Sequence, residues 1–98
     1  MDLRGKTALV TGGAHRVGRA IVIALARAGA KVAINYNTSA VEAAETVTIV
    51  QQAGGQAVAI QADVGDPAQA KLLIQQTAQH FGSVDLLVNN ASDRKSVV

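Results

Sequence analysis

Apolar residues occur along this chain in two alternating patterns. Four short, nearly continuous apolar runs are typical of strands buried on both faces, and three longer stretches with helical spacing separate them. We expect strands at residues 6–11, 31–36, around 58–60 and at 85–89. Helices are expected from the glycine turn to about residue 28, from residue 39 to about 53, and from residue 66 to 81. The predicted order of elements is therefore β-α-β-α-β-α-β.

Polar residues and glycines mark the helix ends. Ser39 and Glu42 have the spacing of a capping box, in which Ser39 would be the N-cap of the second helix. Asp66 followed by Pro67 is typical of the start of the third helix, and Gly82 of its end. The inward face of the second helix is expected to carry Val41, Ala44, Thr48 and either Val47 or Ile49.

Strands that alternate with helices predict an α/β fold. Short connections of this kind imply a parallel sheet with right-handed crossovers. In a doubly wound sheet the strand order is 3-2-1-4, with the first two helices on one face and the third on the other. Ligands bind such sheets where the strand order reverses, beyond the carboxyl ends of strands one and four. Residues 11–18 and 89–92 both fall at that edge.

Composition restricts the class of function. The 98 residues are enough for one small domain or part of a larger one, and 49% of them are hydrophobic. One Tyr, one Phe and no Trp leave little for stacking nucleobases, and the nine basic residues are scattered, so we expect no nucleic-acid partner. Without cysteine and with two histidines, no metal site is expected. No apolar signal segment and no membrane-spanning run are present, so we expect a cytoplasmic protein without a membrane partner.

The turn between the first strand and the first helix is rich in glycine and is a candidate phosphate site. Residues 11–18 read Thr-Gly-Gly-Ala-His-Arg-Val-Gly. The first N–H groups of a helix lack partners inside it, and glycine allows a pyrophosphate to approach the backbone. Glycines also occur where a strand and a helix only pack closely, which is the alternative. A P-loop is disfavoured, because Gly18 is followed by Arg19 and Ala20 rather than by Lys and Ser or Thr.

The end of the second strand indicates which dinucleotide the turn would hold. An NAD site places an acid there to bind the adenosine ribose, whereas residues 35–39 are Asn-Tyr-Asn-Thr-Ser. A carboxylate would repel a 2′-phosphate, and Arg16 inside the turn could pair with one. We therefore expect NADP as the cofactor rather than NAD. Alternatively, Arg16 is a solvated turn residue and Ser39 only a helix cap.

Three motifs, each at a strand end, together resemble the short-chain dehydrogenase/reductase family. They are Thr11-Gly12 with Gly18, Asp63-Val64 after the third strand, and Asn89-Asn90-Ala91 after the fourth. The resemblance extends to about residue 92 and implies the N-terminal, cofactor-binding half of a Rossmann domain, with residues 93–98 as an atypical tail. Two branches of the family are similar in detail. Arg16 and Ser92, where the family usually has glycine, resemble pteridine reductases, and the Asn-Tyr-Asn ending of strand two resembles 3-oxoacyl-carrier-protein reductases.

The resemblance implies a role for each motif in an NADP(H) site. The glycine turn would line the pyrophosphate and adenosine ribose, the end of strand two the 2′-phosphate, the Asp-Val pair the adenine, and the backbone after strand four the cofactor riboses. The implied cofactor-binding residues are Gly12, Arg16, Val17, Gly18, Asn37, Ser39, Asp63, Val64, Asn90 and Ala91. Asn89 would hold strand four to Thr11 rather than contact the ligand. The alternative for Asp63 is a loop acid that caps exposed N–H groups.

The resemblance also implies a reaction, the reduction of a carbonyl or imine in a pterin-like or 3-oxoacyl substrate by hydride transfer. In the family a Tyr gives the proton, a Lys four residues later lowers the pKa of that Tyr, and a Ser polarises the substrate. The only tyrosine here is Tyr36, with Ala40 four residues later, so we expect no catalytic residue in this chain and no activity from it alone. The alternative is a complete, non-catalytic nucleotide-binding or interaction module.

The fourth strand is expected to form an open edge of the sheet. Its centre is Leu86-Leu87-Val88, and exposed apolar strand edges pair with other chains. We therefore expect these 98 residues to self-associate, and a full-length relative to be a homo-oligomer.

Overall fold

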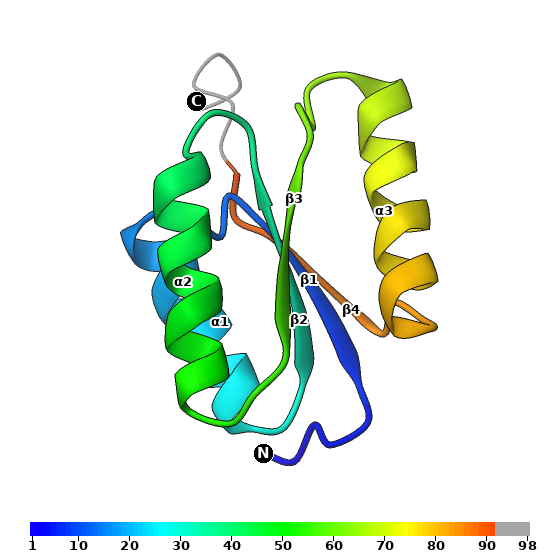
Figure 1. The fold of residues 1–98 in the computed structure, drawn as a ribbon. Coiled ribbons are helices and arrows are strands. Elements are labelled where there is room, and N and C mark those ends of the chain that lie inside the picture. Colours follow the sequence, from blue (N-terminus) through cyan, green and yellow to red (C-terminus); the bar gives the residue numbers. More distant parts are fainter. Residues whose placement is uncertain (92–98) are drawn as a thin grey trace.

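The structure, a computed structural model, describes residues 1–91 and contains one four-stranded sheet (Figure 1). All three strand pairs are parallel, in the order β3-β2-β1-β4, which confirms the predicted order. The strands are β1 (Thr7–Thr11), β2 (Lys31–Tyr36), β3 (Ala57–Gln61) and β4 (Leu86–Asn89). The predicted tail at 93–98 and Ser92 lie outside the described residues.

Three helices connect the strands: α1 (Arg16–Arg27), α2 (Ala40–Gln52) and α3 (Pro67–Phe81). α1 and α2 pack on one face of the sheet and α3 on the other, as predicted (Figure 1). Asp66 caps α3, because its carboxylate accepts the N–H of Ala68 at 3.0 Å, and Gly82 ends the helix with a φ of 95°. Within residues 1–91 no helix is long and apolar enough to cross a membrane.

Two expectations for α2 are wrong. Ser39 lies at the N-cap, but its side chain does not cap the helix, so no capping box forms. The buried side chains of α2 are Ala43, Thr46 and Val50. Of the residues expected on the inward face, Val47 is partly buried and packs against the core, whereas Val41 is 68% exposed. Apolar residues lie on more than one side of this helix, and its sequence therefore does not define a single inward stripe.

Apolar clusters on both faces of the sheet form the core. The cluster under α1 and α2 is the larger and includes Val10, Val22 and Ile34, while Leu9 and Leu73 are part of the smaller cluster under α3. Every residue of β1 is buried, which makes it the centre of the core. In β4 partly buried and exposed residues alternate, and β4 pairs with β1 alone among the described strands.

Hydrogen bonds close the amino end of the sheet, opposite the predicted site. The N–H of Thr7 donates to Asp85 Oδ2 at 2.8 Å, and the N–H of Asp85 donates to the carbonyl of Thr7 at 2.9 Å. The Ser83 hydroxyl donates to the same carboxylate at 3.1 Å. These bonds, chiefly the one from the Thr7 backbone, lower the pKa of Asp85. Nearby, Lys31 donates to the carbonyl of Phe81 at 3.2 Å, at the end of α3.

Candidate functional site

The glycine turn lies between β1 and α1 at the carboxyl end of the sheet. Gly12 has a φ of +64°, and a Cβ at this position would lie 3.0 Å from the Cα of Ala91. His15 is the N-cap of α1, and its side chain does not cap the helix. The first N–H groups of α1 are therefore left for water or a ligand.

Gly18, which the resemblance places at the pyrophosphate and adenosine ribose, lies at the start of α1. It is buried in the first turn of α1, where a Cβ would collide with the carbonyl oxygen of Gly12 and lie 2.7 Å from the Cα of Gly13. It does not line the cleft described below. Gly18 thus allows the helix to pack closely against the turn, which is the alternative considered for glycines of this segment.

Thr11 connects the end of β1 to the segment that follows β4. Its hydroxyl donates to Asn89 Oδ1 at 3.0 Å and accepts the N–H groups of Asn90 and Ala91 at 3.0 and 3.1 Å. The side-chain amide of Asn90 donates to the carbonyl of Gly12 at 3.1 Å. The expected pairing of Asn89 with Thr11 is confirmed, and the two strand ends are held together.

The segment after β2 lies beside the start of α1. Ser39 Oγ and His15 Nε2 are at a hydrogen-bonding distance of 2.9 Å, so the serine hydroxyl contacts α1 rather than capping α2. Asn37 is held by Gln61, whose amide donates to its carbonyl at 3.2 Å. Arg16 is exposed and forms no ion pair within residues 1–91. Arg16, Asn37 and Ser39 line the same cleft.

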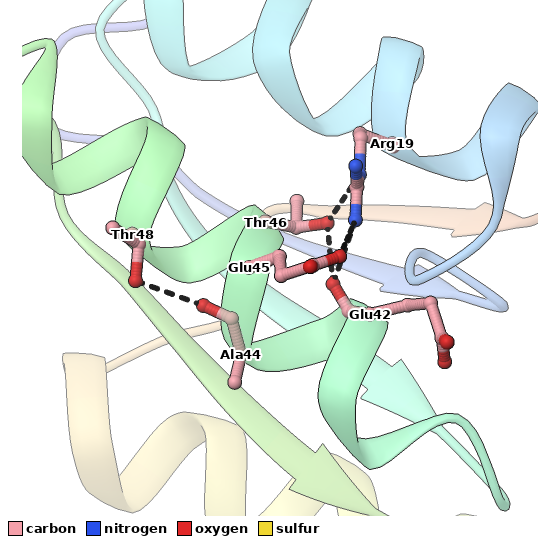
Figure 2. A network of polar contacts seen from close by, with 6 residues as sticks. All are labelled: Arg19, Glu42, Ala44, Glu45, Thr46 and Thr48. Atoms are coloured by element: carbon pink, nitrogen blue, oxygen red, sulfur yellow. Dashed lines mark hydrogen bonds and ion pairs between the residues drawn. The ribbon is translucent and has the colours of Figure 1, made fainter.

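Arg19, the next arginine of α1, is directed to α2 instead (Figure 2). Its Nε donates to Thr46 Oγ1 at 2.8 Å, and its Nη2 donates to the carbonyl of Glu42 at 3.0 Å and to Glu45 Oε1 at 3.2 Å. Arg19 thus connects the two helices, and of these two arginines only Arg16 lines the cleft.

The loop between β3 and α3 presents Asp63. Its Oδ1 accepts the N–H of Gly65 at 2.9 Å, and its own N–H donates to Gln69 Oε1 at 2.8 Å. Asp63 therefore does cap a loop N–H, as the alternative interpretation of this residue states. Its Oδ2 makes no hydrogen bond within residues 1–91, so only one carboxylate oxygen is used to order the loop.

One cleft of about 1400 Å³ unites these segments at the carboxyl edge of the sheet. It is lined by nine of the ten residues that the sequence suggests, namely Gly12, Arg16, Val17, Asn37, Ser39, Asp63, Val64, Asn90 and Ala91. Sequence reasoning missed His15 and Asn35, which also line it. The position of His15 beside Arg16 in the turn was an available signal, whereas nothing local distinguishes Asn35 from other strand residues.

Few charges line this cleft. Arg16 is at the side of α1 and Asp63 is in the loop after β3. Within the part of the chain that the structure describes, no three His, Asp or Glu side chains gather as metal ligands would. The lining suits an organic ligand with an anionic group near Arg16 and a hydrogen-bond donor near Asp63.

A parallel sheet in this order, with a glycine turn where the order reverses, defines a Rossmann-type nucleotide-binding fold. The family model described as short chain dehydrogenase matches residues 6–97, and the chain belongs to this family. The family binds nicotinamide dinucleotides.

Known relatives differ in how much of their length this chain covers. It is 51% identical over 92 residues to the short-chain dehydrogenase/reductase homolog YusS of Bacillus subtilis, covering 94% of this chain and 84% of that protein. It is 48% identical over 95 residues to hydroxynaphthalene reductase arp2 of Aspergillus fumigatus, covering 97% of this chain and 35% of the relative. A solved short chain dehydrogenase from Burkholderia cenocepacia, in complex with NADP, has a TM-score of 0.88 and 41% identity over 100% of this chain and 42% of its own. The chain thus spans most of YusS and less than half of the other two.

Proposed function

We propose that this chain binds NADP(H) in the cleft and forms the cofactor-binding part of a reductase, with residues 1–92 as the N-terminal half of its Rossmann domain. The distribution of charge carries this proposal. The end of β2 has no acid, while Arg16 lines the same cleft without an ion-pair partner in residues 1–91. A 2′-phosphate would gain a charge-assisted hydrogen bond there and would meet no carboxylate. The NADP complex of the similar B. cenocepacia protein supports the choice.

The shape and polarity of the cleft fit a dinucleotide. Gly12 allows the turn to lie close to the segment after β4, where a Cβ would be 3.0 Å from the Cα of Ala91, and the uncapped start of α1 suits a pyrophosphate. Asp63 has an oxygen for the amino group of adenine. The remaining proposed contacts are Val17 at the pyrophosphate, Asn37 and Ser39 at the 2′-phosphate, Val64 at the adenine, and Asn90 and Ala91 at the riboses.

The proposed reaction is reduction of a carbonyl or imine, in a pterin-like or 3-oxoacyl substrate, with the hydride supplied by bound NADPH. Two relatives are a hydroxynaphthalene reductase and a versicolorin reductase, which supports a reductase. The chain itself contributes cofactor binding. Its only tyrosine, Tyr36, has Ala40 rather than Lys four residues later, so it holds no proton donor of the family's kind. The chain alone therefore binds cofactor without turnover.

A non-catalytic nucleotide-binding module is the second candidate. The observation that favours it is the relative YusS, which is itself scarcely longer than this chain.

Either candidate function is compatible with pairing of a second copy of the chain at β4, because the outer edge of β4 is unpaired among the described strands and Leu87 is 57% exposed. Sedimentation at high micromolar concentration should therefore show species larger than a monomer, and a compact monomer would contradict this proposal.

Titration of NADPH and NADH against the wild-type chain and Arg16→Ala tests the cofactor proposal. Wild type should bind NADPH about tenfold more tightly, the value of one charge-assisted contact of about 1.4 kcal/mol. Arg16→Ala should lose this preference through weaker NADPH binding, while Arg27→Ala, a change at the other end of α1, should keep it. Equal binding of both cofactors by wild type, with no effect of Arg16→Ala, would contradict the proposal.

A further inference from the structure

Asn35 is a buried polar residue that is not among the proposed cofactor contacts. It is 2% exposed and lies at the carboxyl end of β2, on the wall of the cleft. Its Nδ2 faces three main-chain carbonyl oxygens, those of Ala62 at 3.1 Å, Ile60 at 3.3 Å and Tyr36 at 3.4 Å. Because all three are acceptors, only the NH₂ group of the amide fits this position.

The hydrogen bonds of Asn35 connect two segments of the proposed site. Its main-chain carbonyl accepts the N–H of Gly13 in the glycine turn at 3.1 Å. Its side chain holds Ala62, which directly precedes Asp63 and is itself 5% exposed. The N–H of Ala62 also donates to the carbonyl of Tyr36 at 3.0 Å. The loop that presents Asp63 therefore leaves the sheet from a point fixed to the end of β2.

We infer that Asn35 is a positioning residue for adenine recognition, which acts by fixing the exit of β3 so that Asp63 presents its carboxylate to the adenine amino group. The inference rests on the proposed function. A side chain without N–H donors would leave the buried carbonyl of Ala62 without this partner, a loss that the loop can relieve only by moving. Arg16 lies on α1, so contact with a 2′-phosphate does not depend on this loop.

The experiment compares the affinities for NADP⁺ and deamino-NADP⁺, in which the hypoxanthine carbonyl replaces the adenine amino group. Wild type should bind NADP⁺ about tenfold more tightly, as expected for one hydrogen bond to a carboxylate. Asn35→Leu should reduce this ratio to about twofold through weaker NADP⁺ binding, with deamino-NADP⁺ affected less than about threefold. Asp63→Ala should reduce the ratio equally, and the double variant should reduce it no further.

Thr77→Val is the matched control. The Thr77 hydroxyl is fully buried and donates to the carbonyl of Leu73 at 2.8 Å, but Thr77 does not line the cleft. This variant should lose stability and keep the tenfold ratio. If Asn35→Leu keeps the tenfold preference for NADP⁺ over deamino-NADP⁺, the positioning role of Asn35 is overturned and the role of Asp63 is not. If the wild-type chain binds both dinucleotides equally, the proposed role of Asp63 and the positioning role of Asn35 are both overturned.

A second measurement needs no variant and therefore does not depend on folding of Asn35→Leu. In the wild-type chain, the side-chain amide protons of Asn35 should exchange with solvent at least about tenfold more slowly than those of the exposed Asn37, because they are buried and hydrogen-bonded. Equal exchange rates at the two asparagines would overturn the inference.

Discussion

The two ends of the parallel sheet are built differently. At the amino end, the main-chain N–H and carbonyl of Thr7 pair with the carboxylate and N–H of Asp85. At the carboxyl end, the bonds made by Asn35 run behind the cleft, while Arg16 and one oxygen of Asp63 line it without partners among residues 1–91. The amino end of the sheet therefore secures the fold, whereas the carboxyl end holds its backbone in place and has unpaired polar groups at the site that we propose for the cofactor.

Gly18→Ala is expected to have the largest effect, and to act on the cleft end of the sheet. The new Cβ would collide with the carbonyl of Gly12, so α1 must move away from the turn. We expect the free energy of unfolding to fall by about 3 kcal/mol and NADPH binding to weaken at least about tenfold. Urea denaturation and cofactor titration measure the two effects.

Gly82→Ala is the control for that change. Gly82 has a φ of 95°, and a Cβ there would have no atom within 4 Å, so the cost should be conformational only, about 1 kcal/mol, with cofactor binding unchanged. A Gly18→Ala chain as stable as the Gly82→Ala chain would contradict the packing role of Gly18.

Asp85→Asn should lower the free energy of unfolding through the amino end of the sheet and leave the cleft end unaffected. Hydrogen bonds hold the pKa of Asp85 in the folded chain below its unfolded value of about 3.9, so the carboxylate stabilises the fold above that pH. This contribution is lost as the pH falls through the lower, folded pKa. The variant should therefore be less stable than wild type at neutral pH, with the difference shrinking below about pH 4, and it should bind NADPH normally.

Denaturant unfolding at a series of pH values measures the Asp85 effect. Asp2→Asn is its control, because the pKa of Asp2 is also lowered, here by a hydrogen bond from Arg4 in an exposed ion pair that should contribute little. A stability difference for Asp85→Asn that stays constant into strong acid would count against the proposed role of the carboxylate.

Thr7→Val should have the smallest effect and the opposite sign. The Thr7 hydroxyl is fully buried and has no hydrogen-bond partner among the described residues. An isosteric valine removes this unpaired group and should raise the free energy of unfolding by about 1 kcal/mol, with no change in cofactor affinity. Thermal unfolding with a fitted midpoint would show it, and a lower midpoint than wild type would mean that the hydroxyl has a partner.

The order of the strands and the faces that the helices cover could be predicted, because the signals are local. Apolar runs mark the strands, and Asp66 and Gly82 mark the ends of α3 by their own backbone preferences. The inward face of α2 could not be predicted. Thr46 is buried there and receives a hydrogen bond from Arg19, which lies 27 positions away in the sequence.

In the site, too, the features with local signals could be predicted, and those that depend on contacts between distant segments could not. Residues in motifs at strand ends, such as Gly12 and Asp63, could be placed at one edge of the sheet, because parallel strands end together. The contact of Ser39 with His15 and the carbonyls around Asn35 depend on how separate segments approach each other. The spacing of Ser39 and Glu42 predicts a capping box, but the Ser39 hydroxyl contacts His15 instead.

We propose that the open, carboxyl end of the sheet binds the 2′-phosphorylated half of the cofactor. An NMR titration of the ¹⁵N-labelled chain with adenosine 2′,5′-bisphosphate measures this binding residue by residue. Amide shift changes are expected at residues 12–17, 37–39 and 63–65, and none at Thr7 or Asp85. No saturable shifts in those three segments, or changes centred on the amino end, would contradict it.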